Sequence, residues 1–209
     1  FKQSTGQPVA ILHDECYLTD IRTAVAGAVA AKYLSPSNVK TIGIVGTGVQ
    51  ARLQLRYLKD IVNCRNVIVW GRNQKALLRY EKEMSMYEYQ ITTTTNMSDI
   101  VEHCQLIVTC TPSERSLINA VRPGTHITAI GSDTVSKREL SSDVMLQADM
   151  IVTDSKDQSR IRGEIYQVLK DGNSLDGITE LGQIISGKIE GRVSQEHITI
   201  ADLTGVAVQ

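Results

Sequence analysis

Residues 41–51 read TIGIVGTGVQA, an apolar run that leads into the pattern G-x-G-x-x-A. In a dinucleotide-binding turn the first glycine allows a tight turn, the second lets the backbone approach a pyrophosphate, and a small third residue lets the helix pack close to the strand. Gly46, Gly48 and Ala51 occupy these positions. The diphosphate would lie against free N–H groups at the helix start. The stretch therefore predicts a strand, a turn and a helix that bind a dinucleotide.

The pattern continues for one complete βαβ unit. Apolar residues at nearly helical spacing predict a helix over residues 49–62, and a second apolar run predicts a strand over residues 66–70. An acidic residue at the end of this strand would bind a ribose 2′-hydroxyl, whereas an arginine accommodates a 2′-phosphate. Arg72 occupies that place, so the sequence favours NADP(H), with NAD(H) as the alternative. Arg72 could instead be a solvated surface cation, and Asn73 could cap the next helix rather than contact a cofactor.

Strand and helix patterns alternate along most of the chain. Strands are predicted over residues 9–12, 90–94, 106–109, 126–130 and 150–152. Helices are predicted over residues 21–34, capped by Thr19-Asp20, and over residues 75–86 and 97–103. This alternation indicates an α/β fold with a doubly wound, mostly parallel sheet. Residues 35–38 are the best candidate for a boundary between a small N-terminal piece and the dinucleotide domain.

Composition argues against several classes of partner. The 209 residues carry 22 Lys and Arg against 23 Asp and Glu, with a net charge of −1 and no long run of either sign. This balance argues against nucleic acid or an anionic membrane as partner. The uncharged, Ala-rich stretch 23–31 is too short to span a bilayer. The four cysteines lack C-x-x-C spacing, which is typical of a reducing cytoplasm, and neither they nor the four histidines show the spacing of metal ligands.

Ligands of doubly wound sheets gather beyond the carboxyl ends of the strands. The expected strand ends lie at residues 46–50, 71–72, 110–112, 131–133 and 154–155. Asp133 ends an apolar strand in a turn of small residues, where a carboxylate could face a bound nicotinamide and substrate. Its alternative role is an Asx-turn or the N-cap of a helix that starts near Lys137, and for Asp154 the same ambiguity favours capping.

A cation stands near the start of the first predicted helix. Arg22 falls in the first turn of helix 21–34, where the helix dipole disfavours positive charge. This position suggests that Arg22 binds an anionic ligand, because guanidinium pairs readily with carboxylate or phosphate. The alternative is an exposed or interface arginine.

Six strings occur together and in order: LTDIRTA (18–24), GTGVQAR (46–52), TAIGSD (128–133), KREL (137–140), TELGQIISGK (179–188) and DLTGVAVQ (202–209). Jointly they make the chain resemble the ornithine cyclodeaminase/mu-crystallin family from residue 6 to residue 209. The resemblance implies a Rossmann-type domain plus a split substrate and dimerisation domain, usually in homodimers. It divides the chain into part of the substrate/dimerisation domain (1–38), an NAD(P)-binding Rossmann domain (39–204) and the start of the return to the first domain (205–209).

The resemblance also implies roles for individual residues. Arg22 would hold the substrate α-carboxylate, and Asp133 would take the catalytic place. The expected cofactor contacts are Thr23, Gly46, Gly48, Val49, Gln50, Arg72, Asn73, Thr111, Ile130, Lys137, Leu203 and Thr204. Family members also reach their substrate with a lysine and an arginine from an N-terminal segment, and they end in a C-terminal helix. These 209 residues include neither feature, so we expect them to form only part of an active site.

The known activities of the family lead to three functional hypotheses. The first is an NAD(P)H-dependent oxidoreductase that acts on the C–N bond of an amino or imino acid, as a ketimine reductase or amino-acid dehydrogenase, by hydride transfer between the nicotinamide and the substrate α-carbon. The second is ornithine cyclodeaminase, a lyase that converts ornithine to proline plus ammonia with recycled NAD. The third is a non-catalytic, NADPH-dependent ligand-binding protein. Arg72 favours the first hypothesis.

Overall fold

The computed structural model describes residues 1–11 and 13–205, in which strands and helices alternate. The strands are β1 (Ile42–Val45), β2 (Asn66–Trp70), β3 (Gln90–Thr94), β4 (Leu106–Thr109), β5 (His126–Ala129), β6 (Met150–Thr153), β7 (Thr179–Glu180) and β8 (Thr199–Asp202). The helices are α1 (Tyr17–Leu34), α2 (Val49–Leu58), α3 (Gln74–Met84), α4 (Met97–His103), α5 (Ser142–Leu146), α6 (Lys156–Ser159), α7 (Glu164–Lys170) and α8 (Leu181–Ile185), with a 3₁₀ turn η1 (Ser85–Tyr87).

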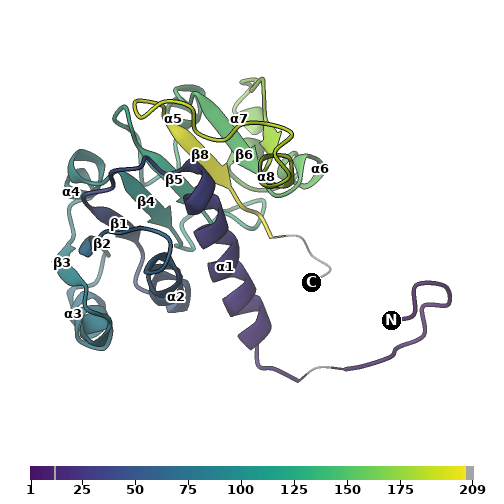
Figure 1. Cartoon of the computed structure of the whole chain (residues 1–209), viewed down its shortest axis with the longest axis horizontal. Helices are drawn as coiled ribbons and strands as arrows, with labels where there is room; N and C mark the ends of the chain where they lie inside the picture. Colours follow the sequence, from purple (N-terminus) through teal and green to yellow (C-terminus); the bar gives the residue numbers. More distant parts are fainter. Residues whose placement is uncertain (12, 206–209) are drawn as a thin grey trace.

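The strands form one eight-stranded sheet in the order β3-β2-β1-β4-β5-β8-β6-β7 (Figure 1). Every pairing between the described strands is parallel, and Ile42 of β1 is matched to Val67 of β2 on one side and to Leu106 of β4 on the other. Along the chain, strands are added first on one side of β1, up to β3, and then on its other side, from β4 to β5. The order in which strands are added therefore reverses between β1 and β4. This confirms the expected α/β, doubly wound sheet, in which ligands bind at the point of reversal.

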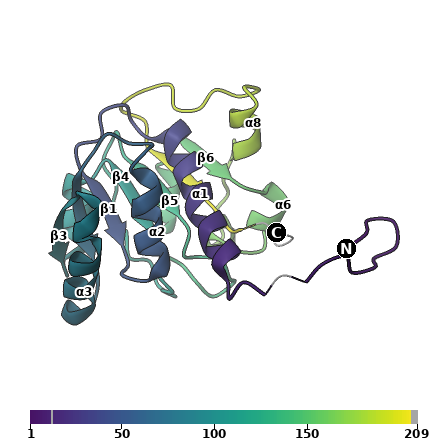
Figure 2. The same ribbon diagram turned by 60° about the horizontal axis from the view of Figure 1, so that its bottom comes forward.

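Helices cover both faces of the sheet. Figure 2 shows α1, α2 and α3 in front of it. On that face Ile42 and Ile44 of β1 pack in a buried cluster with Leu55 of α2 and Tyr80 of α3. On the other face Val45 of β1 belongs to a second buried cluster with residues of α4, α5 and α7. A strand covered on both sides is apolar at nearly every position, which explains why the central strands were recognisable in the sequence.

The N-terminal helix begins earlier than predicted. α1 starts at Tyr17, and the Asp14 carboxylate accepts a hydrogen bond from the backbone N–H of Leu18 (2.7 Å), so Thr19-Asp20 is not its cap. α1 packs closely on α2 at Gly27, where an added Cβ would lie only 2.1 Å from the side-chain oxygen of Gln54. Among the described helices none is both long and apolar enough to cross a membrane.

Residues 1–11 are exposed and extend away from the sheet (Figure 1). The strand predicted over residues 9–12 is wrong for residues 9–11, which pair with no strand of the described chain and adopt no regular structure. Leu12 lies outside the described residues. Residues 206–209 also lie outside the described residues. Of the segment 205–209, which is expected to return to the first domain, the structure therefore describes only Gly205.

Between residues 42 and 130 the predicted elements are present, and the differences lie at their ends. α2 stops at Leu58 instead of residue 62, α3 stops at Met84, where η1 follows, and β5 stops at Ala129. After residue 131 only β6 was predicted. The elements missed there are α5, α6, α7, α8, β7 and β8, each two to seven residues long. Such short segments contain too few turns or alternations for periodicity to reveal them.

His126 of β5 is a buried, neutral ring within the sheet. Its Nδ1 lies 2.8 Å from Oγ1 of Thr199, and its Nε2 lies 3.0 Å from Oγ1 of Thr128. Burial, assisted by the nearby Arg192 guanidinium, lowers the pKa of His126 to about 3. These contacts give His126 a structural role.

We expect His126 to make the protein sensitive to acid. Because its folded pKa lies below the ordinary 6.5, the stability that depends on the neutral ring is present above pH 6.5. That stability is lost as the pH falls toward 3, by about 1.4 kcal/mol per pH unit. Urea unfolding at a series of pH values measures the slope. His126→Gln should flatten it, whereas His103→Gln, at an exposed site on α4, should not; identical slopes in all three proteins would contradict this assignment.

Candidate functional site

The glycine turn joins β1 to α2 at the carboxyl edge of the sheet. Gly46 has a φ of 129°, and a Cβ there would lie 3.0 Å from the carbonyl oxygen of Cys110, so the position requires glycine. A Cβ on Gly48 would meet no atom within 4 Å, which leaves this backbone open to a ligand. Gly48 is the N-cap of α2, where no described side chain caps the helix and no acidic residue lies in the first turn. The turn therefore offers free N–H donors to a diphosphate.

Side-chain hydrogen bonds between α1 and α2 bring the first helix to this turn. Gln50, in the first turn of α2, donates from Nε2 to Oδ1 (3.0 Å) and to the backbone oxygen (3.2 Å) of Asp20. Gln54, one helical turn later, donates from Nε2 to the backbone oxygen of Thr23 (3.0 Å). Arg22 and Thr23 are consequently held beside the start of α2.

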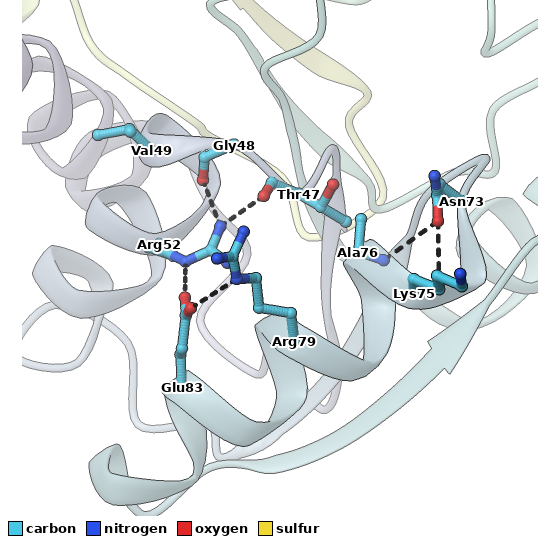
Figure 3. Close-up of a pocket in the computed structure, with 9 residues that line it drawn as sticks. All are labelled: Thr47, Gly48, Val49, Arg52, Asn73, Lys75, Ala76, Arg79 and Glu83. Carbon is cyan, nitrogen blue, oxygen red and sulfur yellow. Dashed lines mark hydrogen bonds and ion pairs between the residues drawn. The ribbon is translucent and has the colours of Figure 1, made fainter.

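A cavity of about 630 Å³ opens between the glycine turn and the start of α3 (Figure 3). It is lined by Thr47, Gly48, Val49, Arg52, Asn73, Lys75, Ala76, Arg79 and Glu83. Glu83 accepts from Nε of Arg52 (2.6 Å) and lies 3.3 Å from Nε of Arg79. Arg52 also donates to the backbone oxygens of Thr47 and Gly48, which braces the turn. Three cations and one carboxylate leave the lining with an excess of positive charge that favours an anionic ligand.

A smaller cavity of about 170 Å³ runs from the glycine turn to the ends of β2 and β4. Arg72 and Thr111 are among its lining residues. Arg72 is exposed and takes part in none of the ion pairs of the described chain. Asn73 caps α3, because its side-chain oxygen accepts a hydrogen bond from the backbone N–H of Lys75 (2.9 Å). The capping interpretation of Asn73 is therefore confirmed.

Arg22 lies in the second turn of α1, because the helix begins at Tyr17. The expectation that it opposes the helix dipole in the first turn is therefore wrong, since the dipole acts mainly within that turn. Its guanidinium lies against the turn after β8, where a Cβ on Gly205 would be 3.3 Å from Nη1 and 3.5 Å from Nη2. Its Nε is buried and finds no hydrogen-bond partner in the described chain. A buried N–H on a cation is costly to leave without a partner, which makes Arg22 a candidate to bind an anionic ligand.

Asp133 lies in the loop after β5, with its side chain 53% exposed. Its Oδ1 accepts from Nζ of Lys137 at 2.7 Å, so two of the expected site residues are paired with each other. The helix expected near Lys137 does not form, and the next helix, α5, is capped by Ser141. The N-cap alternative for Asp133 is therefore wrong, and its carboxylate is left with an ion pair that a ligand can reach.

The loop after β5 and the turn after β8 lie side by side. Ala129 of β5 is in register with Asp202 of β8, so both strands end at the same level. Asp133 and the Gly205 turn, against which Arg22 lies, therefore extend from adjacent strand ends. The structure brings the proposed carboxylate clamp and the proposed catalytic carboxylate to one edge of the sheet.

The turn after β8, which contains Leu203 and Thr204, is held by hydrogen bonds from the segment that follows β6. Asp154 accepts from the backbone N–H of Gly205 (2.7 Å) and from Oγ1 of Thr204 (3.1 Å). Gln158 donates to Oγ1 of Thr204 (2.6 Å). The cap of α6 is Ser155 and not Asp154, so the capping expected of Asp154 is wrong. Asp154 instead sets the shape of the β8 turn.

Three buried carboxyl groups, which the sequence analysis did not single out, lie beneath this edge. Glu139, Glu164 and Asp202 are each no more than 1% exposed. Burial raises the pKa of all three, that of Glu164 to about 8 and that of Asp202 to about 7, and repulsion from Asp202 contributes at Glu164. The string KREL contains Glu139, but nothing local to this string signals that the glutamate will be buried.

The residues at this edge fit a dinucleotide. The expected cofactor contacts all lie at or beside the ends of β1, β2, β4, β5 and β8, or on α1 where it packs against α2. The open backbone at Gly48 and the cations around the adjoining cavity are suited to phosphate groups. Among the described residues, no group of three or more His, Cys, Asp or Glu side chains is placed to hold a metal ion.

Comparison with known proteins agrees with this geometry. Residues 1–209 match the profile of the ornithine cyclodeaminase/mu-crystallin family. An uncharacterized cyclodeaminase from Sinorhizobium fredii is 40% identical over 210 residues, which cover 98% of this chain and 63% of the relative. The chain therefore spans slightly less than two thirds of the length of this curated relative.

Two solved structures share the fold. An archaeal alanine dehydrogenase dimer with bound NAD has a TM-score of 0.90 at 34% identity, covering 98% of this chain and 64% of that one. The Δ1-pyrroline-2-carboxylate reductase of Thermococcus litoralis, in complex with NADH and L-proline, has a TM-score of 0.90 at 31% identity, covering 97% and 64%. On the combined evidence of sequence and fold, this chain belongs to the ornithine cyclodeaminase/mu-crystallin family.

Proposed function

We propose that the protein is an NADP(H)-dependent oxidoreductase that acts on the C–N bond of a small amino or imino acid, as a ketimine reductase or amino-acid dehydrogenase. The observation that carries the proposal is an open glycine turn on the same sheet edge as the buried Nε of Arg22, which has no hydrogen-bond partner among residues 1–11 and 13–205. The first feature suits a diphosphate and the second an anionic substrate group. The alanine dehydrogenase and pyrroline-carboxylate reductase neighbours support this pairing of cofactor and substrate class.

Basic residues after β2 support NADP(H) as the preferred cofactor. Arg72 is exposed at the strand end where a carboxylate would select a ribose 2′-hydroxyl. The adjoining cavity is lined by Arg52, Lys75 and Arg79, with Glu83 as its acidic member. This excess of positive charge matches the additional phosphate of NADP(H). NAD(H), the cofactor of the alanine dehydrogenase neighbour, is the alternative.

The cofactor, when bound, would supply or accept the hydride at the substrate α-carbon. Arg22 would pair with the substrate α-carboxylate and so determine which face of the α-carbon meets the nicotinamide. Asp133, at the adjacent strand end, would exchange a proton with the substrate nitrogen. Lys137 would orient the Asp133 carboxylate through their 2.7 Å ion pair.

We also propose a homodimer in which residues 1–38 belong to a substrate and dimerisation domain, residues 39–204 form the Rossmann domain, and the chain returns to the first domain from residue 205. The alanine dehydrogenase neighbour is a dimer. In the N-terminal part, Val9, Ile11, Tyr17 and Leu18 are large apolar residues that stand exposed in the single chain. Apolar surface of this kind is typical of an interface.

Ornithine cyclodeaminase activity is the second candidate, favoured by the cyclodeaminase relative at 40% identity. In that reaction ammonia leaves, the ring closes and the hydride returns to the same carbon. The cofactor would therefore show no net change.

We expect the protein to oxidise NADPH when it is given a cyclic ketimine, or an α-keto acid with ammonia. Sustained loss of dihydronicotinamide absorbance measures this activity. Release of ammonia and proline from ornithine without a net absorbance change would instead establish the cyclodeaminase. Tight NADPH binding with no turnover of either substrate class would indicate a ligand-binding protein.

Replacing Arg72 by aspartate should change cofactor choice. Loss of a charge-assisted bond to the 2′-phosphate should raise the Kd for NADPH about tenfold or more, while the Kd for NADH changes less than about twofold. Titration of both cofactors measures the effect. Arg56→Asp, the same charge change at the far end of α2, is the matched control and should alter neither Kd. Equal losses for the two cofactors in Arg72→Asp would refute the assignment.

Replacing Arg22 by alanine should weaken substrate binding. We expect the KM for the amino or imino acid to rise about tenfold or more, because a guanidinium–carboxylate pair is lost, with little change in the Kd for NADPH. Steady-state kinetics and cofactor titration separate the two effects. Lys32→Ala, which removes a cation from the opposite end of α1, should leave both values unchanged. An unaltered KM in Arg22→Ala would remove Arg22 from the substrate site.

A further inference from the structure

One buried carboxylate joins the loops that follow β4 and β5. Glu139 Oε1 accepts hydrogen bonds from the backbone N–H (2.6 Å) and Oγ1 (2.7 Å) of Thr111, and its Oε2 accepts one from the backbone N–H of Gly131 (2.9 Å). Hydrogen bonds to a charged acceptor are roughly twice as strong as those between neutral groups. The side chain therefore ties together the ends of two neighbouring parallel strands.

These two loops lie close together at Gly131. A Cβ on Gly131 would lie 2.3 Å from the carbonyl oxygen of Thr111 and 2.5 Å from Oε2 of Glu139. No residue larger than glycine fits there without displacing backbone. The absence of a side chain at Gly131 permits this close approach, and the Glu139 carboxylate bonds to both loops.

Glu139 is held in turn by a second buried carboxyl group. Glu164, the first residue of α7, accepts hydrogen bonds from the backbone N–H groups of Glu139 (2.7 Å) and Leu140 (3.2 Å). Asp202, the last residue of β8, accepts one from the backbone N–H of Ile165 (2.9 Å), the next residue of α7. A continuous set of hydrogen bonds therefore connects β8, α7 and the loops after β5 and β4.

The three buried carboxyl groups differ in how many hydrogen bonds they accept. Three neighbouring buried carboxyl groups cannot all be ionised without a cation, and none of them takes part in an ion pair of the described chain. Glu139 faces three donors, whereas Asp202 has a buried Oδ1 with no partner among the described residues. Burial raises the pKa of Glu164 to about 8 and of Asp202 to about 7, so this pair retains a proton near neutral pH. Burial raises the pKa of Glu139 as well, while the hydrogen bonds from Thr111 and Gly131 oppose that shift and stabilise its carboxylate form.

We propose that Glu139 is a positioning residue that sets the spacing of the β4 and β5 loops around the nicotinamide half of the cofactor. This inference rests on the proposed function. β2 and Arg72 lie on one side of the reversal between β1 and β4 and would serve the adenosine half, whereas β4 and β5 lie on the other side. Glu139 acts through the backbones of Thr111 and Gly131 and reaches no reacting atom itself.

The test compares two ligands in the Glu139→Gln variant. Glutamine keeps the volume but replaces one acceptor oxygen by an NH₂ group, which would face a backbone N–H. NADPH reports on both halves of the site, and adenosine 2′,5′-bisphosphate reports on the adenosine half alone. Quenching of Trp70, the single tryptophan of the 209 residues, follows both ligands, because Trp70 lines the cavity that contains Arg72. We expect the Kd for NADPH to rise about tenfold, and that for the bisphosphate to change less than about twofold.

Two further variants complete the experiment. Gly131→Ala pushes the same loops apart while it keeps the carboxylate, and it should show the same selective loss even if Glu139→Gln does not fold. Glu102→Gln, at an exposed glutamate on α4, should affect neither ligand. Equal losses of both ligands, or unchanged affinities, in the two loop variants would overturn the inference. Failure of the unmodified protein to bind NADPH would instead overturn the proposed function.

Discussion

Parallel pairing of β1 with β2 on one side and with β4 on the other underlies the arrangement of the whole sheet edge. Because every described strand runs the same way, the ends of strands far apart in the sequence meet at one edge. The glycine turn, Arg72 and Asp133 follow three different strands and come together only for this reason. The same pairing forces helical crossovers on both faces, which bury β1 completely and leave its carboxyl end as the accessible part.

Charge is divided between the surface and the interior of this edge. Arg72 lines a cavity beside the glycine turn and the Arg22 guanidinium lies against Gly205, whereas Glu139 and its two carboxyl neighbours are buried. The buried groups use backbone N–H donors as partners instead of cations. A proton retained by the Glu164 and Asp202 pair limits the cost of burying three acids.

The sequence predicted the central strands and the glycine turn because their signals are local. A strand buried on both faces is apolar throughout. Gly46 and Gly48 are required by the backbone conformation of a turn that spans only a few residues. Asn73 was likewise recognisable as a possible cap, because capping acts over three residues. Prediction failed where the partner is distant: Asp154 binds the turn at Thr204 and Gly205 instead of capping α6.

The α/β class, the dinucleotide turn and the candidate residues at the strand ends can be predicted from the amino-acid sequence, since each follows from periodicity, glycine spacing or the order of short strings. The folded chain was needed to show that α1 begins at Tyr17, that the Arg22 guanidinium lies against Gly205, and that Glu139 joins two loops. This is because burial and hydrogen-bond partners depend on segments that are far apart in the sequence and meet only in the fold. No local sequence pattern shows which carboxyl group will be buried away from water.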